Sequence, residues 1–194
     1  MGDKAKRADA RRNEEALLAA AAAVFVTSGV DAPVRDIAAR AGVGVGTIYR
    51  HFPTRAELVI AVYRHQVDAC AEAGPTLLAD CATPREALTR WIDLFVDFLV
   101  TKHGLRSDNA ALHTYFIDRL VPACADLLAA AGIAPDVTAY ELMRGIGNLC
   151  VDAAPGYNPR NLVALLIAGL PETEPETEPE TESGPRPGSR TAAG

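Results

Sequence analysis

Residues 34–52 carry the sequence VRDIAARAGVGVGTIYRHF, and this stretch decides the fold. Apolar Ile37 and Ala41 at helical spacing predict a first helix that stops at Gly42, because glycine takes the left-handed conformation after a helix without a Cβ penalty. A second helix is expected to begin near Val45. Two short helices joined by a three- or four-residue turn with a glycine form the pattern of a helix-turn-helix.

The second helix of such a pair presents its N-terminal side chains to base edges in the DNA major groove. Ile48 and Phe52 lie four residues apart and are expected to face inward. That arrangement leaves the polar side chains of the same helix exposed, and it predicts a DNA-binding surface.

A longer stretch resembles the N-terminal DNA-binding domain of the TetR family of bacterial repressors. The resemblance covers residues 13–62, about a quarter of the chain. It rests on the helix of residues 14–26, Gly29, the Ile37-Ala38 and Ala41-Gly42-Val43 runs, and the run from Gly46 to Leu58. Two positions depart from the usual pattern, since Pro33 and Gly44 stand where hydroxyl side chains commonly cap the second and third helices.

The resemblance, together with side-chain chemistry, implies a role for each exposed residue. Arg50 is the candidate for bidentate readout of a guanine, and Thr47 for contact with a thymine methyl. Tyr49 is expected to bond phosphate oxygens, which fixes register without reading sequence. For each residue a plain solvated surface role stays the alternative. The expected DNA-binding residues are Arg35, Val45, Gly46, Thr47, Tyr49, Arg50, His51 and Arg55.

The net charge of −6 is unevenly distributed along the chain. Residues 1–55 hold nine Lys/Arg and six Asp/Glu, whereas residues 56–170 hold eight and thirteen and residues 171–194 hold two and six. The basic charge therefore lies at the proposed DNA-binding end. Residues 1–12 are expected to be a flexible basic arm, which either reaches DNA or merely aids solubility.

The four cysteines, Cys70, Cys81, Cys124 and Cys150, are far apart and form no metal-binding pattern. Reduced, buried thiols are expected, with no metal and no cofactor. The charged start argues against a signal peptide, and the longest apolar run, residues 162–170, is too short to cross a bilayer. The interpretation is a cytoplasmic protein that does not associate with membranes.

The whole chain is expected to be all-α, with about nine helices. Capping boxes at Thr54, Thr83 and Thr138 predict helices over 55–73, from 84 to before 104, and from 138 to about 153. Further helices are expected at 107–118, 122–131 and 159–169. Residues 171–194 begin with three Pro-Glu-Thr-Glu repeats and predict a disordered acidic tail.

Between the arm and the tail we expect a helix-turn-helix domain over 13–54 and a helical effector-binding and dimerisation domain over 55–170. The last helix is apolar almost all the way round, which requires burial on more than one side. A homodimer formed with the preceding helix is favoured over an ordinary monomer core, as the resemblance implies. The expected interface residues are Leu142, Ile146, Leu149, Leu162, Leu165 and Leu166.

The resemblance also implies a pocket among the middle helices. Ligand pockets are mostly apolar with a few polar groups, although a stripe of aromatic residues is more often plain core. The expected partner is a small hydrophobic effector. The candidate pocket residues are Trp91, Phe95, Phe98, His113, Phe116, Tyr140 and Met143.

These patterns predict a homodimeric transcriptional regulator that binds a palindromic operator, most simply a repressor released by its effector. No nucleophile–base set, carboxylate pair or phosphate loop stands out, so we expect no enzymatic activity. An activator, a corepressor-dependent regulator, and an all-α ligand-binding protein or enzyme stay open as alternatives.

Overall fold

The computed structural model describes residues 2–102, 110–150 and 157–171, and in these ranges it contains helices and no strands. The expectation of an all-α fold is therefore confirmed. The helices are α1 (Gly2–Ser28), α2 (Val34–Ala41), α3 (Val45–His51), α4 (Arg55–Asp80), α5 (Pro84–Lys102), α6 (Ala110–Ala130), α7 (Ala139–Leu149) and α8 (Pro159–Ala168).

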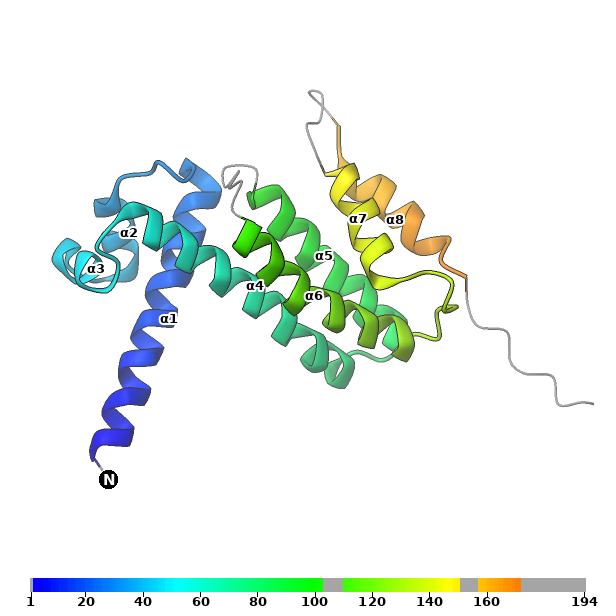
Figure 1. The fold of residues 1–194 in the computed structure, drawn as a ribbon, viewed down its shortest axis with the longest axis horizontal. Helices are drawn as coiled ribbons and strands as arrows, with labels where there is room; N and C mark the ends of the chain where they lie inside the picture. Colours follow the sequence, from blue (N-terminus) through cyan, green and yellow to red (C-terminus); the bar gives the residue numbers. More distant parts are fainter. Residues whose placement is uncertain (1, 103–109, 151–156, 172–194) are drawn as a thin grey trace, which may run out of the picture.

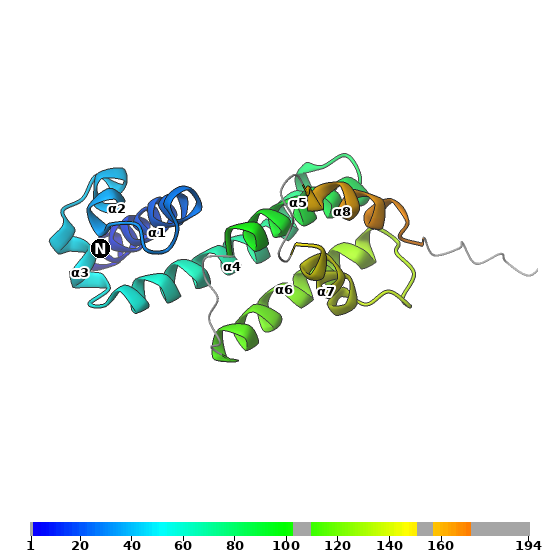
Figure 2. The same ribbon diagram turned by 90° about the horizontal axis from the view of Figure 1, so that it is seen from above.

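The helices form two groups connected by α4 (Figures 1 and 2). We call α1–α3 with the first turns of α4 the head, and the rest of α4 with α5–α8 the body. Leu58 and Val62 of α4 belong to the hydrophobic core of the head, whereas Val67 and Cys70 belong to that of the body. One continuous helix thus contributes to both cores.

The α1 helix begins at Gly2, so residues 2–12, expected to form an arm before the first helix, are helical; a flexible arm stays a prediction. Oppositely charged residues at helical spacing explain the difference. Arg11 pairs with Glu15 at 2.9 Å, and Arg12 pairs with Asp9 three residues earlier. Such pairs each stabilise a helix by a few tenths of a kcal/mol. Figure 1 shows this part of α1 extending away from the other helices.

The α4 helix continues through Gly74 and Pro75 to Asp80, although the sequence predicted an end near Ala73. Tertiary packing overrides the two helix breakers. Gly74 is buried, and the position of an added Cβ lies 3.7 Å from Leu127 Cδ1. Pro75 is exposed, at the edge of the groove between α4 and α6. The buried face of α4 thus remains intact despite the lost backbone donor.

The single helix α6 stands where the sequence predicted two helices, 107–118 and 122–131. The described residues therefore contain eight helices and not the nine predicted. Leu120, Cys124 and Leu127 are fully buried on both sides of Pro122, which is itself exposed. A continuous apolar stripe therefore holds the helix together across the proline. Residues 107–109 lie outside the described residues.

The predicted N-caps at Thr54 and Thr138, and the predicted helix starts at Pro84 and Pro159, are confirmed. At α4 the backbone N–H of Glu57 donates to Thr54 Oγ1 at 3.2 Å, and Glu57 Oε2 accepts from the Thr54 N–H at 2.9 Å. The same reciprocal box opens α7 at Thr138. At α5 the Glu86 carboxylate bonds the N–H of Ala82 instead. The α7 helix ends at Leu149 with Cys150 as its C-cap, before the predicted end near residue 153.

No helix in the described part of the chain has the length and apolar character needed to span a bilayer. The same residues contain no group of three or more side chains suited to hold a metal ion. The division into units at 13–54 and 55–170 stays a prediction. The expected acidic tail lies outside the described residues except for Pro171, whose carbonyl accepts a hydrogen bond from Ala134 N at 2.9 Å.

Candidate DNA-binding surface and ligand pocket

The turn between α2 and α3 has the predicted geometry. Gly42 adopts φ +68°, in the left-handed region that favours glycine. The N–H of Val43 then donates to Ala38 O at 3.0 Å, which closes the end of α2. Ile48 and Phe52 are both buried, as their spacing predicted. The core of the head therefore fixes the orientation of α3.

The outer face of α3 is exposed. Tyr49 has an exposed fraction of 49%, and Arg50 and His51 are exposed as well. Arg50 has no hydrogen bond or ion pair with any described residue, so its five donors are available. Thr47 is half-buried at the base of this face. The backbone at Gly46 is open, because nothing lies within 4 Å of an added Cβ.

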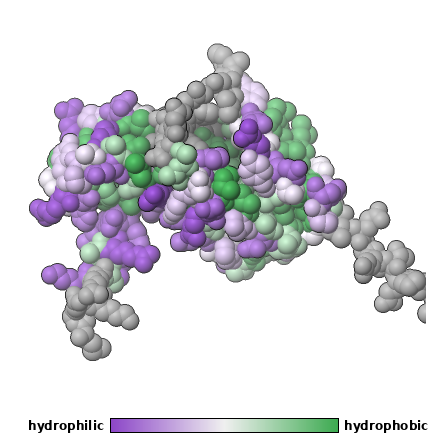
Figure 3. Space-filling model, in the orientation of Figure 1, coloured by the Kyte–Doolittle hydropathy of each residue, from purple (hydrophilic) through white to green (hydrophobic). Residues whose placement is uncertain are grey.

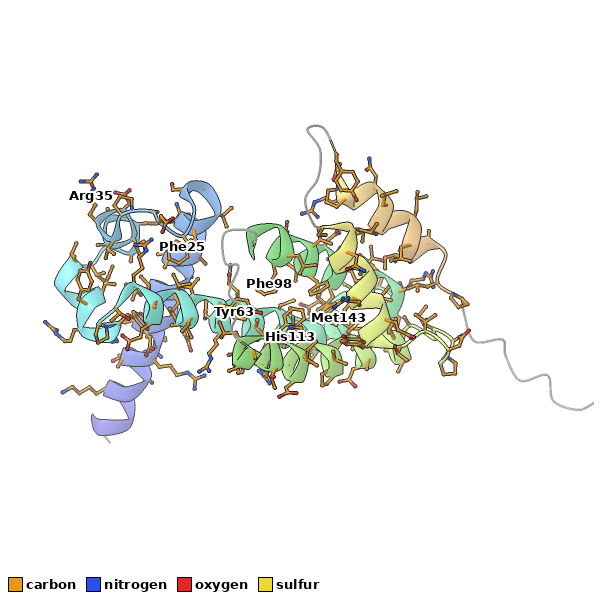
Figure 4. The ribbon with its side chains drawn as sticks, turned by 45° about the horizontal axis from the view of Figure 1, so that its top comes forward. Phe25, Arg35, Tyr63, Phe98, His113 and Met143 are labelled. Atoms are coloured by element: carbon orange, nitrogen blue, oxygen red, sulfur yellow. The ribbon has the colours of Figure 1, made fainter. Side chains whose placement is uncertain are left out.

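The remaining predicted residues of this surface lie on both sides of α3. Val45 is exposed at the first position of α3. Arg35 lies at the start of α2, with 81% of its side chain exposed and a contact of 3.5 Å to the carboxylate of Asp36. Figure 4 shows Arg35 pointing away from the head, on the side opposite the body. Pro33 and Gly44 precede α2 and α3 and make no side-chain capping bond.

Arg55 is held inside the head, unlike the other predicted DNA-binding residues. Its Nε donates to the carbonyl of Val30 at 2.8 Å, and a terminal nitrogen bonds the same oxygen. The guanidinium also lies 5.5 Å from the centre of the Phe25 ring. Arg55 thus joins the start of α4 to the segment after α1, and this position assigns it a role in holding the head together.

A cavity of about 220 Å³ lies between α5, α6 and α7. Five of the predicted pocket residues line it: Phe95, His113, Phe116, Tyr140 and Met143. Figure 4 shows His113 and Met143 close together on α6 and α7. The other lining residues are Leu99, Ile117, Arg144, Gly147 and Asn148. Arg144 and Asn148 were not predicted. They follow Tyr140 at intervals of four residues, and this helical spacing places them on the same face of α7.

Trp91 and Phe98 do not line this cavity, contrary to expectation. Trp91 is fully buried, and its indole N–H donates to the carbonyl of Cys70 at 2.8 Å. Phe98 packs between Tyr63 and Phe116, with ring centres 5.6 and 5.9 Å away. Both residues belong to the hydrophobic core of the body.

A hydrogen-bonded cluster joins α6 to α4 and is named here the α4–α6 clamp: Asp68, Tyr115 and Arg119. The Tyr115 hydroxyl donates to the Asp68 carboxylate at 2.7 Å, and Arg119 Nε donates to it at 2.8 Å. Desolvation by burial, followed by the hydrogen bond and negative charge of Asp68, raises the pKa of Tyr115. The hydroxyl therefore stays protonated at neutral pH and remains a donor.

The predicted dimerisation residues separate into two sets. Leu142 and Ile146 of α7 are buried in the core of the chain's own body, and Leu149 is half-buried. Leu162, Leu165 and Leu166 of α8 are exposed, Leu165 to 69%. In Figure 3 hydrophobic residues gather at the end of the molecule where α7 and α8 lie. Among these six residues, those with exposed side chains therefore all lie on α8.

The prediction of buried thiols is confirmed for Cys70, Cys124 and Cys150, whereas Cys81 is half-buried. Burial raises the pKa of Cys70 and of Cys124 to about 12. Both stay protonated at neutral pH and are poor nucleophiles, since the thiolate is the reactive form.

Arg55→Ala is expected to lower the free energy of unfolding by about 1–3 kcal/mol, because it removes a partly buried, charged donor from the Val30 carbonyl. Arg50→Ala removes the same side chain from an exposed position and is expected to change stability by less than about 0.5 kcal/mol. Urea unfolding followed by circular dichroism measures both. Equal stability of the two variants would refute the structural role of Arg55.

Comparison with known proteins agrees with this geometry. The family profile described as "Bacterial regulatory proteins, tetR family" matches residues 17–62. The chain is similar to the HTH-type transcriptional activator FasR of Mycolicibacterium smegmatis, with 37% identity over 92 residues; the match covers 47% of this chain and 41% of that relative's length. It is also similar to the solved structure of a TetR transcriptional regulator from Streptomyces coelicolor, with 32% identity, a TM-score of 0.68, and coverage of 83% of this chain and 99% of that one. A second similar structure is the TetR transcription regulatory protein from Mycobacterium vanbaalenii, with 31% identity and a TM-score of 0.64. The match covers 85% of this chain and 98% of that one. The chain belongs to the TetR family of DNA-binding, helix-turn-helix transcriptional regulators.

Proposed function

We propose that the protein is a homodimeric repressor that binds a palindromic operator and releases it when a small organic effector enters the cavity between α5, α6 and α7. It acts on DNA in the cytoplasm and catalyses no reaction. The observation that carries the proposal is the exposed outer face of α3, with Arg50 in its last turn, where no described residue hydrogen-bonds or pairs with it.

Charge and geometry support the DNA-binding roles of individual residues. Residues 1–55 carry a net charge of +3 in a chain whose total is −6. Arg50 reads a base edge, whereas Tyr49, His51 and Arg35 contact phosphates on either side. Thr47, Val45 and Gly46 allow the start of α3 to approach the groove closely. The Arg55 guanidinium already donates hydrogen bonds to the Val30 carbonyl, so it contacts a phosphate only through its remaining N–H groups.

The apolar surface of α8 supports dimerisation. Three exposed leucines on one short helix form a patch of the kind that marks a protein–protein interface. A dimer with a twofold axis matches a palindromic operator, whose half-sites are related by the same symmetry. Two α3 helices then reach successive major grooves, about 34–36 Å apart.

The path from the cavity to the head supports regulation by a ligand. Phe116 and Ile117 of α6 line the cavity. Tyr115 and Arg119 of the same helix hold Asp68 of α4 through the α4–α6 clamp. A ligand that shifts α6 therefore tilts α4 and, with it, the head. The coupling is reciprocal, so bound DNA weakens effector binding by the same factor.

Activation of transcription is the second candidate function, because the relative FasR is named as a transcriptional activator. Binding to the operator is common to both functions. A reporter gene placed behind the operator distinguishes them, since deletion of the regulator raises expression under repression and lowers it under activation.

Selection of bound sequences from a random duplex pool tests the proposal. We expect a palindromic consensus whose half-sites are about one helical turn apart. Arg50→Ala is expected to lose preference at one position in each half-site, at a cost of about 1–3 kcal/mol. Tyr49→Phe is expected to weaken all sequences alike, since phosphate contacts carry no sequence information. Failure to enrich any sequence at low salt, or the same loss on every sequence for both variants, would contradict the proposal.

Leu165→Glu is expected to give a folded monomer that loses operator affinity at least tenfold, because a carboxylate cannot be buried in an apolar interface without a partner. Leu94→Glu, which charges an exposed leucine on α5, is the matched control and is expected to remain dimeric. Sedimentation velocity measures the oligomeric state. A dimer that survives Leu165→Glu would move the interface away from α8.

A further inference from the structure

The cavity between α5, α6 and α7 has an apolar floor and a polar rim. Phe95, Phe116 and Met143 are almost fully buried and form the floor. His113 and Arg144 are exposed at the rim. A ligand that fills this cavity therefore needs an apolar body and a polar end.

The charge of the lining is one-sided. Of the ten described residues around the cavity, Arg144 carries a full positive charge and none is acidic. Other cavities of the body are lined in part by acidic side chains. Glu72 and Asp126 line the groove between α4 and α6, and Asp93 lines the one between α5 and α8. The cavity beside Arg144 is thus suited to an anion and disfavours a cation.

Arg144 has no hydrogen bond or ion pair with any described residue. Other arginines of the body are engaged: Arg119 holds Asp68 at 2.8 Å, and Arg160 pairs with Asp93 and Asp97. The nearest acid on α7, Glu141, accepts hydrogen bonds from Thr138 in the capping box. The guanidinium of Arg144 therefore keeps its bidentate donor set for a molecule in the cavity.

His113 lies one helix away, on α6. Its ring stacks on Phe116, with ring centres 6.3 Å apart and an angle of 15° between the planes. The stacking holds the imidazole beside the apolar floor, and a neutral imidazole offers one N–H donor in either tautomer. The rim thus contains donors from two helices, on α6 and on α7.

The volume limits the size of the ligand. A dry cavity of about 150 Å³ accepts benzene, and the present one measures about 220 Å³. Pockets for drug-sized ligands are larger, at about 300–1,000 Å³. One ring with a short side chain, or an aliphatic chain of similar volume, fits this space.

We infer that the cavity binds a small amphiphilic carboxylate, with its apolar body against Phe95, Phe116 and Met143 and its carboxylate on Arg144 and His113. The inference rests on the proposed function for the location of the effector, and it adds the effector's chemical class. A carboxylate that joins Arg144 of α7 to His113 of α6 draws these two helices together. Because α6 holds α4 through the clamp, the anionic group is the part of the ligand that moves the head.

Three matched probes test the charge requirement: 4-phenylbutyrate, its neutral amide 4-phenylbutanamide, and the cation 4-phenylbutylamine. The full-length protein is titrated without DNA, so the outcome does not depend on operator binding. Trp91, the single tryptophan of the chain, stacks on Phe95 at 5.7 Å and reports by its fluorescence on filling of the cavity. We expect the acid to bind at least tenfold more tightly than the amide, and the amine most weakly. Octanoate, an aliphatic acid of similar size, is expected to bind as well.

Arg144→Gln is expected to weaken binding of the acid by about 10–100-fold, the range for loss of a charged hydrogen-bond partner, and to leave the amide within about threefold. Arg90→Gln removes the same charge from an exposed site on α5 and is the matched control. Equal affinity for acid and amide, a preference that survives in Arg144→Gln, or no binding of either acid would overturn the inference. If the protein selects an operator but binds the amide or the amine most tightly, the proposed function stands. Only the inference of a carboxylate ligand is then contradicted.

Discussion

The structure depends on the continuity of α4, which is a single helix shared by two hydrophobic cores. Leu58 and Val62 lie in the core of the head, and Val67, Cys70 and Ala71 lie in the core of the body. Because packed cores resist deformation, a rotation of α4 in the body is passed on to the head. Arg55, at the first turn of α4, ties this helix to the segment after α1 through the Val30 carbonyl. The direction in which α3 faces DNA is therefore set by how α4 lies in the body.

The body controls α4 through a small number of polar contacts and many apolar ones. The hydroxyl of Tyr115 and the guanidinium of Arg119 hold the carboxylate of Asp68, and Arg64 lies 5.2 Å above the Tyr115 ring. Phe116, next to Tyr115 on α6, turns instead toward the cavity. One helix thus contacts the ligand site with one face and the helix that carries the head with another. This arrangement gives the proposed effector a short physical route to the DNA-binding surface.

Local sequence patterns predicted those elements whose structure depends on local interactions. The turn at Gly42 follows from a left-handed conformation, and the starts of α4 and α7 follow from capping boxes three residues long. Sequence reasoning failed where packing from distant helices decides the outcome. Gly74 and Pro75 read as a helix end, yet Leu127 and Trp91 pack against this turn and sustain it. Trp91 was predicted to line the pocket, yet its indole N–H donates to a backbone carbonyl 21 residues away. Arg55 was predicted to contact DNA, and nothing in the sequence indicated that it also bonds the Val30 carbonyl 25 residues away. The place of Arg144 at the cavity likewise depends on how α7 lies against α5 and α6.

The operator affinity of Tyr115→Phe, measured over a series of salt concentrations, tests most directly whether the body sets the position of the head. The variant keeps the ring and removes the hydroxyl that donates to Asp68. The account predicts an affinity about 3–30-fold weaker, in the range of coupling energies carried by such networks. The slope of log K against log salt is expected to stay unchanged, because no phosphate contact is lost. Arg90→Gln, which alters an exposed side chain on α5 that takes no part in the α4–α6 clamp, is the control. An affinity equal to that of the unaltered protein would contradict the account.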